Sequence, residues 1–405
     1  MPPKSFNIAV PDEALKRLRQ KLQSAAFPDE LDNVGWDMGV PLDEIKRLTN
    51  YWRDGFNWRE QEQKLNQQFK QFTVSVSVDG FEDLEIHYLQ HTSKRPGAIP
   101  LLFIHGWPGS FIEVTKLVPL LTSGDEDTPA FDVIAPSLPN FGFSSVVNKR
   151  GFGLHQYAEA LHNVMTTLGY KEYVTQGGDW GSFISRTMAR KYPDHVKAIH
   201  LNFIPMRFPM PWQNPLFFIQ DLLPVPFSPD RKAYLSSVFN YLTKGSGYMI
   251  QQSTRPQTLG YALHDSPVAL LAWIYDKLHL WTDNYPWTDN EILTWVTIYL
   301  FSVAGPAAST RIYYETAEDG SLTESMSIPA PVSVKIGVAQ FKNELMRYPM
   351  SWTKLLGSTV KATEYPRGGH FAAWEVPDLL VGDVREFFGK GGPAFGVVSG
   401  RNGFE

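Results

Sequence analysis

The chain of 405 residues contains no cysteine. This absence excludes a thiol nucleophile, disulfide bonds and a zinc site held by cysteine ligands. Long apolar runs are also missing: none approaches the ~20 residues of a membrane-spanning helix. Residues 1–7 have no apolar core of the kind found in secretion signals. We therefore expect a soluble, cytoplasmic protein without a membrane anchor.

A strong charge of one sign is absent too. The net charge of −5 is spread along the chain, so no basic stripe is available for nucleic acid or anionic lipid. The chain is instead rich in aromatic residues, at 14% with 12 tryptophans. Most of these belong in a core, although such a surplus can also wall an apolar pocket. The length suits a catalytic domain of roughly 200–300 residues with additions.

Hydrophobic periodicity predicts an α/β fold. Residues 11–24 and 41–70 have helical spacing, and residues 72–90 alternate as a β-hairpin does. Strand and helix patterns then alternate, which favours a mostly parallel sheet with helices on both faces. The predicted strands are 101–104, 131–138, 172–178, 196–203, 331–339 and 360–366, and the predicted helices are 156–169, 182–192 and 378–388.

The middle of the chain, residues 205–329, breaks this alternation. It opens with a proline-rich stretch at 203–230 and continues with helical patterns without strands. One of these helices is expected to begin at the capping box Thr288–Glu291. We interpret this segment as a helical cap inserted between two strands of the sheet.

The turn Gly177-Gly178-Asp179-Trp180-Gly181 lies between a predicted strand and a predicted helix. Small residues two positions before and two after the central one are what a nucleophile elbow requires, because the turn is too tight for a Cβ there. A glycine-rich turn whose aspartate caps the next helix would show the same pattern. The turn alone therefore leaves both interpretations open.

Two further motifs favour the elbow. The segment His105–Ser110, HGWPGS, follows an earlier strand, where a hydrolase places a loop that donates an oxyanion N–H. The N–H groups of Trp107 and Trp180 are the predicted donors. His105 itself is expected to brace the loop. Among the 10 histidines, His370 alone has the place and order of a triad base, after the last strand.

The acid partner of His370 should follow a strand and precede the histidine. Glu344, after the strand predicted to end at Ala339, meets this requirement. The end of the preceding strand offers only Asn202, an amide without charge. Glu364 falls within a predicted strand and Asp378 comes too late. In this order the residues predict an α/β-hydrolase fold with Asp179 as nucleophile. A carboxylate is already ionised near neutral pH and needs no base to attack.

The motifs HGWPGS, GGDWGS and RGGHFAAWEVPDLL resemble those of the microsomal-type epoxide hydrolases, a group that includes soluble fungal enzymes. The resemblance runs over nearly the whole chain, including an N-terminal helical meander. Two cap segments, 245–249 and 309–315, resemble the family's two catalytic tyrosine segments, which implies Tyr248 and Tyr313. Tyr314, beside Tyr313, is the alternative among 17 tyrosines.

This resemblance implies conversion of a small apolar epoxide and water to a vicinal diol through an ester on Asp179. No cofactor or metal is implied, no nucleic acid partner, and a homodimer is plausible. The implied organisation has four parts. They are the N-terminal meander and first hairpin at 1–95, the first part of the α/β-hydrolase core at 96–204, the helical cap at 205–329 and the second part of the core at 330–405.

Two other functions remain open at this point. A haloalkane-type dehalogenase also has an aspartate in the elbow and a histidine base, but it needs N–H donors for a halide where an epoxide needs an acidic hydroxyl. The paired cap tyrosines favour the epoxide. A non-catalytic α/β-hydrolase homologue that binds an apolar ligand commonly lacks a catalytic residue, and this chain lacks none of them.

Overall fold

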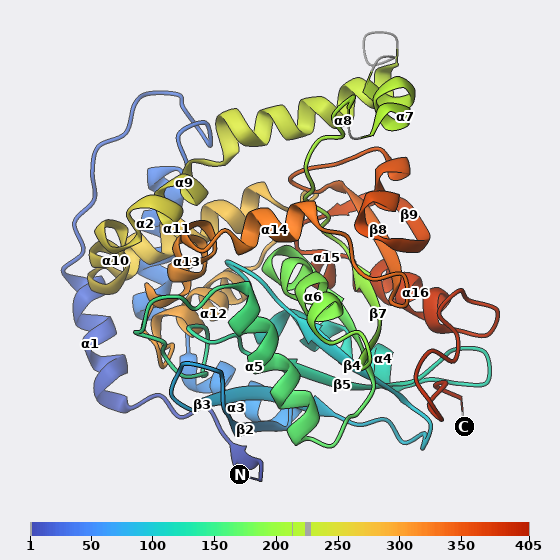
Figure 1. The fold of residues 1–405 in the computed structure, drawn as a ribbon. Coiled ribbons are helices and arrows are strands. Elements are labelled where there is room, and N and C mark those ends of the chain that lie inside the picture. The colour runs from blue at the N-terminus through green and yellow to red at the C-terminus, as the bar shows by residue number, and fades with distance from the viewer. Residues whose placement is uncertain (1, 213, 223–227, 405) are drawn as a thin grey trace.

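A computed structural model describes residues 2–212, 214–222 and 228–404. The strands of these residues form one sheet in the order β1-β2-β3-β5-β4-β6-β7-β8-β9 (Figure 1). In chain order they are β1 (Lys4–Phe6), β2 (Gln71–Val76), β3 (Leu84–His91), β4 (Ile99–Ile104), β5 (Phe131–Pro136), β6 (Tyr173–Gly177), β7 (Val196–Leu201), β8 (Lys335–Asn343) and β9 (Ser358–Gly369).

The helices before the cap are α1 (Asp12–Gln23), α2 (Leu42–Asp54), α3 (Trp58–Gln68), η1 (Phe111–Lys116), α4 (Val118–Thr122), α5 (Leu154–Thr167) and α6 (Asp179–Lys191). Those between β7 and β8 are α7 (Pro215–Phe217), η2 (Phe218–Leu222), α8 (Pro229–Asn240), η4 (Tyr241–Gly245), α9 (Gly247–Thr254), α10 (Pro256–Asp265), α11 (Pro267–Leu280), α12 (Asp289–Leu300), η5 (Ala308–Thr310), α13 (Arg311–Glu318) and α14 (Ser321–Ser327). Those that follow are η6 (Met350–Leu356), α15 (Ala372–Glu375) and α16 (Pro377–Phe388).

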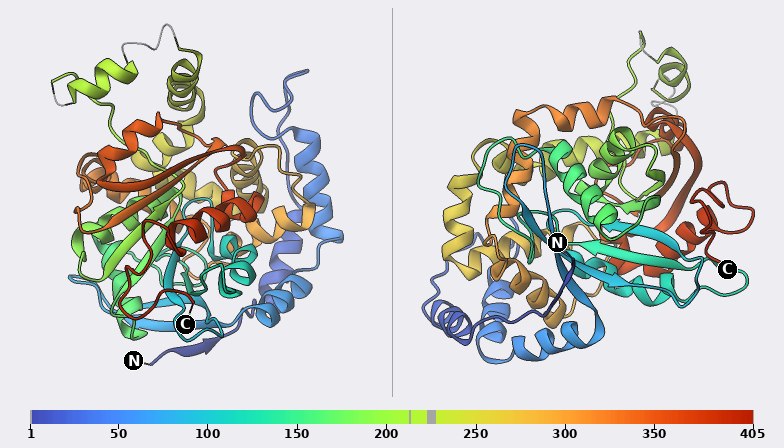
Figure 2. Two further views of the ribbon diagram at one scale, coloured as in Figure 1. Left: turned by 90° about the vertical axis from the view of Figure 1, so that its right-hand side faces the viewer. Right: turned by 60° about the horizontal axis from the view of Figure 1, so that its bottom comes forward.

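The sheet is antiparallel from β1 to β5 and parallel from β5 to β9. This arrangement confirms the mostly parallel sheet and the hairpin that the sequence predicts. Every residue of β4 and β5 is buried, as expected for parallel strands covered on both faces. Helices α5 and α6 lie on one face, and α4 and α16 lie on the other (Figure 2).

The described residues between β7 and β8 contain helices and no strand, and α12 begins at the Thr288 capping box as predicted. Of the proline-rich stretch predicted at 203–230, residue 213 and residues 223–227 lie outside the described residues. Helices α7 and α8 project from the body of the molecule (Figure 1). The N-terminal helices α1 and α2 pack on α11, and α2 and α3 pack on α12.

Several predicted boundaries differ from the structure. Residues 41–70 form two helices, because α2 ends at Asp54 with Gly55 as its C-cap, and Asn57 caps the start of α3. Helix α6 begins at Asp179 rather than at Ser182. Strand β8 ends at Asn343 rather than at Ala339, since its pairing with β9 continues until Asn343 meets Gly369. Glu344 therefore follows the strand directly, without a loop between them.

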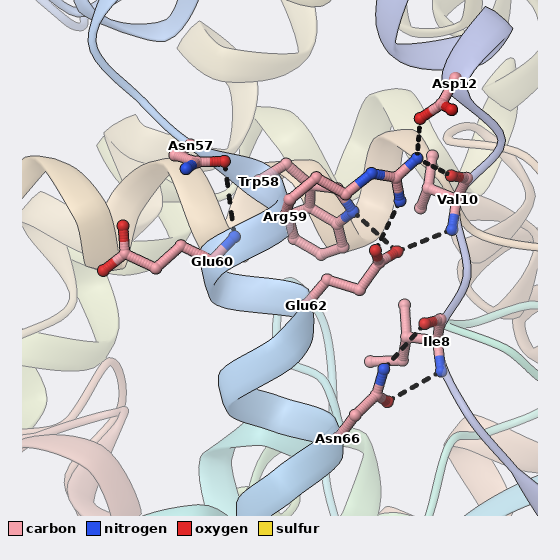
Figure 3. A network of polar contacts seen from close by, with 9 residues as sticks. All are labelled: Ile8, Val10, Asp12, Asn57, Trp58, Arg59, Glu60, Glu62 and Asn66. Carbon is pink, nitrogen blue, oxygen red and sulfur yellow. Dashed lines mark hydrogen bonds and ion pairs between the residues drawn. The ribbon is translucent and has the colours of Figure 1, made fainter.

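A buried carboxylate joins the N-terminal segment to α3 (Figure 3). Glu62 accepts hydrogen bonds from the backbone N–H of Val10 at 2.7 Å and from the Trp58 indole at 3.2 Å. Arg59 bonds the other oxygen of Glu62 and also reaches Asp12. Glu62 is only 7% exposed, so these bonds compensate for the removal of its charge from water.

Replacement of Glu62 by alanine should destabilise the protein by about 2–3 kcal/mol, because buried donors on Val10 and Trp58 lose their acceptor. Urea unfolding followed by tryptophan fluorescence measures the change. Glu60→Ala is the matched control, since the Glu60 side chain is exposed on the same helix. Equal unfolding midpoints for the two variants would contradict a structural role for the Glu62 network.

Candidate active site

Asp179 lies in a tight turn between β6 and α6, and its backbone has φ +47°. L-residues rarely adopt this conformation, and it costs free energy that the surrounding structure must supply. A Cβ on Gly181 would lie 1.9 Å from the carbonyl oxygen of Ile104, and one on Gly177 would lie 2.4 Å from that of Gly181. Only glycine fits at these two places, as the elbow predicted from the sequence requires.

The loop that follows β4 brings an N–H group to the Asp179 carboxylate. The backbone N–H of Trp107 donates to Asp179 Oδ1 at 2.7 Å. A Cβ on Gly106 would lie 2.1 Å from the same oxygen, so glycine is needed for this close approach. Trp180 is the second residue of α6, in the first turn, where backbone N–H groups have no partner within the helix.

The loop is held from both sides. His105 Nε2 accepts from the N–H of Leu138 at 3.2 Å, and Nδ1 lies 2.9 Å from the carbonyl oxygen of Gly106. Burial lowers the pKa of His105 to about 4, so it stays neutral and braces the loop. From the cap, Tyr299 donates to the carbonyl of Gly109 at 2.6 Å.

His370 lies between two carboxylates. Its Nε2 is 3.2 Å from Asp179 Oδ2, and its Nδ1 donates to Glu344 Oε1 at 2.6 Å. The register of the sheet explains this meeting. Asn343 pairs with Gly369 at the ends of β8 and β9, and Glu344 and His370 are the residues that follow these two strands. The structure thus brings together the three side chains that chain order predicted.

Two opposing effects act on the His370 imidazole. Burial alone would lower its pKa, but the charges of Glu344 and Asp179 outweigh burial and raise the pKa to about 10. The imidazole is therefore protonated near neutral pH. Loss of the charge on Asp179 would remove part of this stabilisation.

Tyr248 on helix α9 and Tyr313 on helix α13 reach from the cap to the cavity beside Asp179. The Tyr248 ring stacks on Trp107 with centroids 5.2 Å apart, and the Tyr313 ring meets Trp180 edge to face at 4.8 Å. Burial raises the pKa of both phenols well above the usual value, so both remain protonated. Tyr314 instead points to Arg150, with its hydroxyl 3.4 Å from the guanidinium.

An apolar cavity of about 240 Å³ extends from Asp179 between the core and the cap. Tyr248, Tyr313 and Trp180 contribute to its wall, and the rest is mostly apolar. Further lining residues are Phe183, Phe203, Met206, Val238, Met249, Leu322, Met326 and Met346. Such a site suits a small apolar ligand whose polar atom meets the tyrosines.

Two buried residues of this region were not found from the sequence. Tyr241 exchanges a hydrogen bond with Tyr248, with 2.8 Å between the hydroxyl oxygens. Glu113 lies in the first turn of η1, beside the loop that follows β4. It is buried, and its carboxyl accepts a hydrogen bond from the N–H of Ser110. The pattern Ser110-Phe-Ile-Glu113 signals a capping box, but nothing in the sequence indicates that its carboxyl approaches Asp179.

Among the described residues, no group of three or more His, Asp or Glu side chains is arranged to hold a metal ion. In the same part of the chain, no helix combines the length and apolar character needed to cross a membrane.

Residues 3–114 match the protein family described as "Epoxide hydrolase N terminus", and residues 99–225 match the family described as "alpha/beta hydrolase fold". Epoxide hydrolase 1 of Sus scrofa is 35% identical over 411 residues, which cover 95% of this chain and 88% of that protein.

Two solved structures are similar over almost their full length. The epoxide hydrolase of Aspergillus niger superposes with a TM-score of 0.81 at 32% identity, covering 95% of each chain. Juvenile hormone epoxide hydrolase of the silkworm Bombyx mori gives a TM-score of 0.84 at 30% identity, covering 94% of this chain and 93% of that one. With sequence, N-terminal region and fold all shared in this way, the chain belongs to the microsomal-type epoxide hydrolase family and is an epoxide hydrolase of the α/β-hydrolase fold.

Proposed function

We propose that this epoxide hydrolase converts a small apolar epoxide and water to a vicinal diol through an ester formed on Asp179. One observation carries the proposal. The Asp179 carboxylate lies 3.2 Å from the His370 imidazole and forms the polar end of an apolar cavity that Tyr248 and Tyr313 also line. The nucleophile and both acids thus border one space that an apolar substrate can fill, and the base lies directly beside the nucleophile.

In the first step an Asp179 oxygen attacks an epoxide carbon, and the C–O bond of the ring breaks. The developing alkoxide is stabilised by hydrogen bonds from Tyr248 and Tyr313 and takes a proton from them. Their raised pKa values keep both phenols protonated until the substrate oxygen develops charge. The product of this step is a hydroxyalkyl ester on Asp179.

Ester formation prepares His370 for the second step. A neutral ester replaces one of the two carboxylates that hold the pKa of His370 at about 10, so its pKa falls. The imidazolium then releases its proton, and this proton replaces the one that the tyrosines gave to the alkoxide, so the phenols are restored. Neutral His370, oriented by Glu344 through Nδ1, is now a base.

In the second step His370 takes a proton from water, and the oxygen of that water attacks the carbonyl carbon of the ester. The N–H groups of Trp107 and Trp180 stabilise the oxyanion, and collapse of the intermediate releases the diol and restores Asp179. The scheme uses no cofactor or metal. Dehalogenation is not proposed, since the family is that of epoxide hydrolases.

Three expectations from the sequence stay predictions: the division of the chain at residues 95, 204 and 329, the homodimer, and the cytoplasmic location.

Replacement of His370 by glutamine should trap the ester, because the variant keeps Asp179 as nucleophile but lacks the base of the second step. We expect diol formation to fall by about 10²- to 10⁴-fold. Mass spectrometry of the intact protein should then show an added mass equal to that of one epoxide. Asp179→Ala is the control and should show neither adduct nor diol. Absence of an adduct from His370→Gln would overturn the two-step scheme.

Removal of both phenolic hydroxyls, by Tyr248→Phe with Tyr313→Phe, should slow ring opening by about 10²- to 10⁴-fold, since no acid then meets the alkoxide. Stopped-flow tryptophan fluorescence reports the ring-opening step through Trp107 and Trp180, which contact these rings. Tyr314→Phe, which removes a hydroxyl directed at Arg150, should behave as the wild type. Ring opening at the wild-type rate in the double variant would refute the assignment of these tyrosines.

A further inference from the structure

Asp179 borders two separate cavities. The first is the apolar cavity of about 240 Å³ described above. The second has a volume of about 20 Å³ and shares no other lining residue with the first. A cavity needs about 10–15 Å³ to hold one water molecule, so the second has room for a single water. His370, Glu113, Gln176 and Asn202 are among the residues that line it.

The polar lining of the small cavity suits water. An isolated buried water is stable where it makes about three hydrogen bonds to polar groups. The cavity borders both the Asp179 carboxylate, which becomes the ester, and the His370 imidazole, which becomes the base. Substrate in the large cavity and water in the small one would therefore approach Asp179 from different spaces, so the bound ester need not move aside for water.

Glu113 is held in the wall of the small cavity by the backbone. Its Oε1 accepts the N–H of Ser110 at 3.2 Å, and only 9% of the residue is exposed. A Cβ on Gly109 would lie 1.7 Å from Oε1, so the carboxyl occupies space that any residue other than glycine would fill. The HGWPGS segment thus leaves room for a carboxyl group beside the nucleophile.

The protonation state of Glu113 allows its carboxyl to lie beside the Asp179 carboxylate. Burial raises the pKa of Glu113 to about 8. Nearby His370 lowers this pKa in part, and Asp179 raises it further. Near neutral pH the group is therefore mostly a neutral carboxyl, which adds little negative charge next to the nucleophile. A neutral carboxyl still offers a carbonyl oxygen as a hydrogen-bond acceptor.

We propose that Glu113 binds the hydrolytic water in the small cavity and orients it toward the Asp179 ester. This inference rests on the proposed two-step function. One O–H of the water donates to the Glu113 carboxyl and the other to His370 Nε2. The water oxygen then forms a bond to the ester carbonyl carbon while its proton passes to His370. The diol oxygen leaves with the proton that His370 returns, so Glu113 neither gains nor loses a proton.

Replacement of Glu113 by leucine, of similar size but without an acceptor, should slow ester hydrolysis about 10- to 100-fold. Ring opening should proceed at the wild-type rate. Glu113→Gln keeps a carbonyl oxygen and should restore hydrolysis to within about threefold. Rapid mixing, acid quenching and mass spectrometry of the intact enzyme measure how fast the ester forms and decays.

Two further variants separate binding of water from stability. Gly109→Ala keeps the Glu113 residue, but the added methyl group displaces its carboxyl group. This variant should lengthen the life of the ester as Glu113→Leu does. Ser110→Ala removes only the hydroxyl that caps η1 by accepting a hydrogen bond from the N–H of Ile112. This variant should lower the melting temperature without changing the life of the ester. This pair remains informative if Glu113→Leu fails to fold.

The outcomes are distinct. An ester that decays at the wild-type rate in Glu113→Leu and in Gly109→Ala would overturn the role of Glu113, and so would equal slowing of ring opening and hydrolysis. Absence of any ester even in His370→Gln would instead overturn the two-step function itself. Selective slowing of hydrolysis in Glu113→Leu, restored by glutamine, would establish the proposal.

Discussion

Helix α6 begins against the end of strand β4 with no space for a side chain between them, because Gly181 packs on the carbonyl of Ile104. The remainder of the site depends on this contact. In the same tight turn Asp179 has a positive φ, and its carboxylate reaches the N–H of Trp107 and the imidazole of His370. The strain at one residue is supported by the buried strands β4 and β6 on either side of the turn.

Electrostatics then couples the two chemical steps. In the free enzyme a protonated His370 lies 3.2 Å from Asp179 Oδ2 and 2.6 Å from Glu344 Oε1. In our proposal, conversion of Asp179 to an ester removes one charge and turns the same imidazole into a base. One histidine therefore serves both steps without moving, and the change in its pKa follows from the reaction itself.

Much of this site is predictable from chain order. The ends of parallel strands meet at one edge of a sheet, so an aspartate after β6, a glutamate after β8 and a histidine after β9 were expected to meet. The boundaries were less accurate: the predicted end of β8 was four residues early, since pairing with β9 extends the strand from Ala339 to Asn343. Tyr248 and Tyr313 came only from resemblance, because no spacing rule selects them among 17 tyrosines. Tyr241 and Glu113 were missed, since their places depend on tertiary contacts with the cap and with Gly109.

The central claim is that the oxygen that opens the epoxide comes from Asp179 and not directly from water. A single turnover of excess enzyme in water enriched in heavy oxygen tests it directly. We predict that the diol of this first turnover contains only ordinary oxygen, and that the peptide containing Asp179 gains heavy oxygen. A diol that contains heavy oxygen, with Asp179 unlabelled, would show direct attack by water and contradict the account.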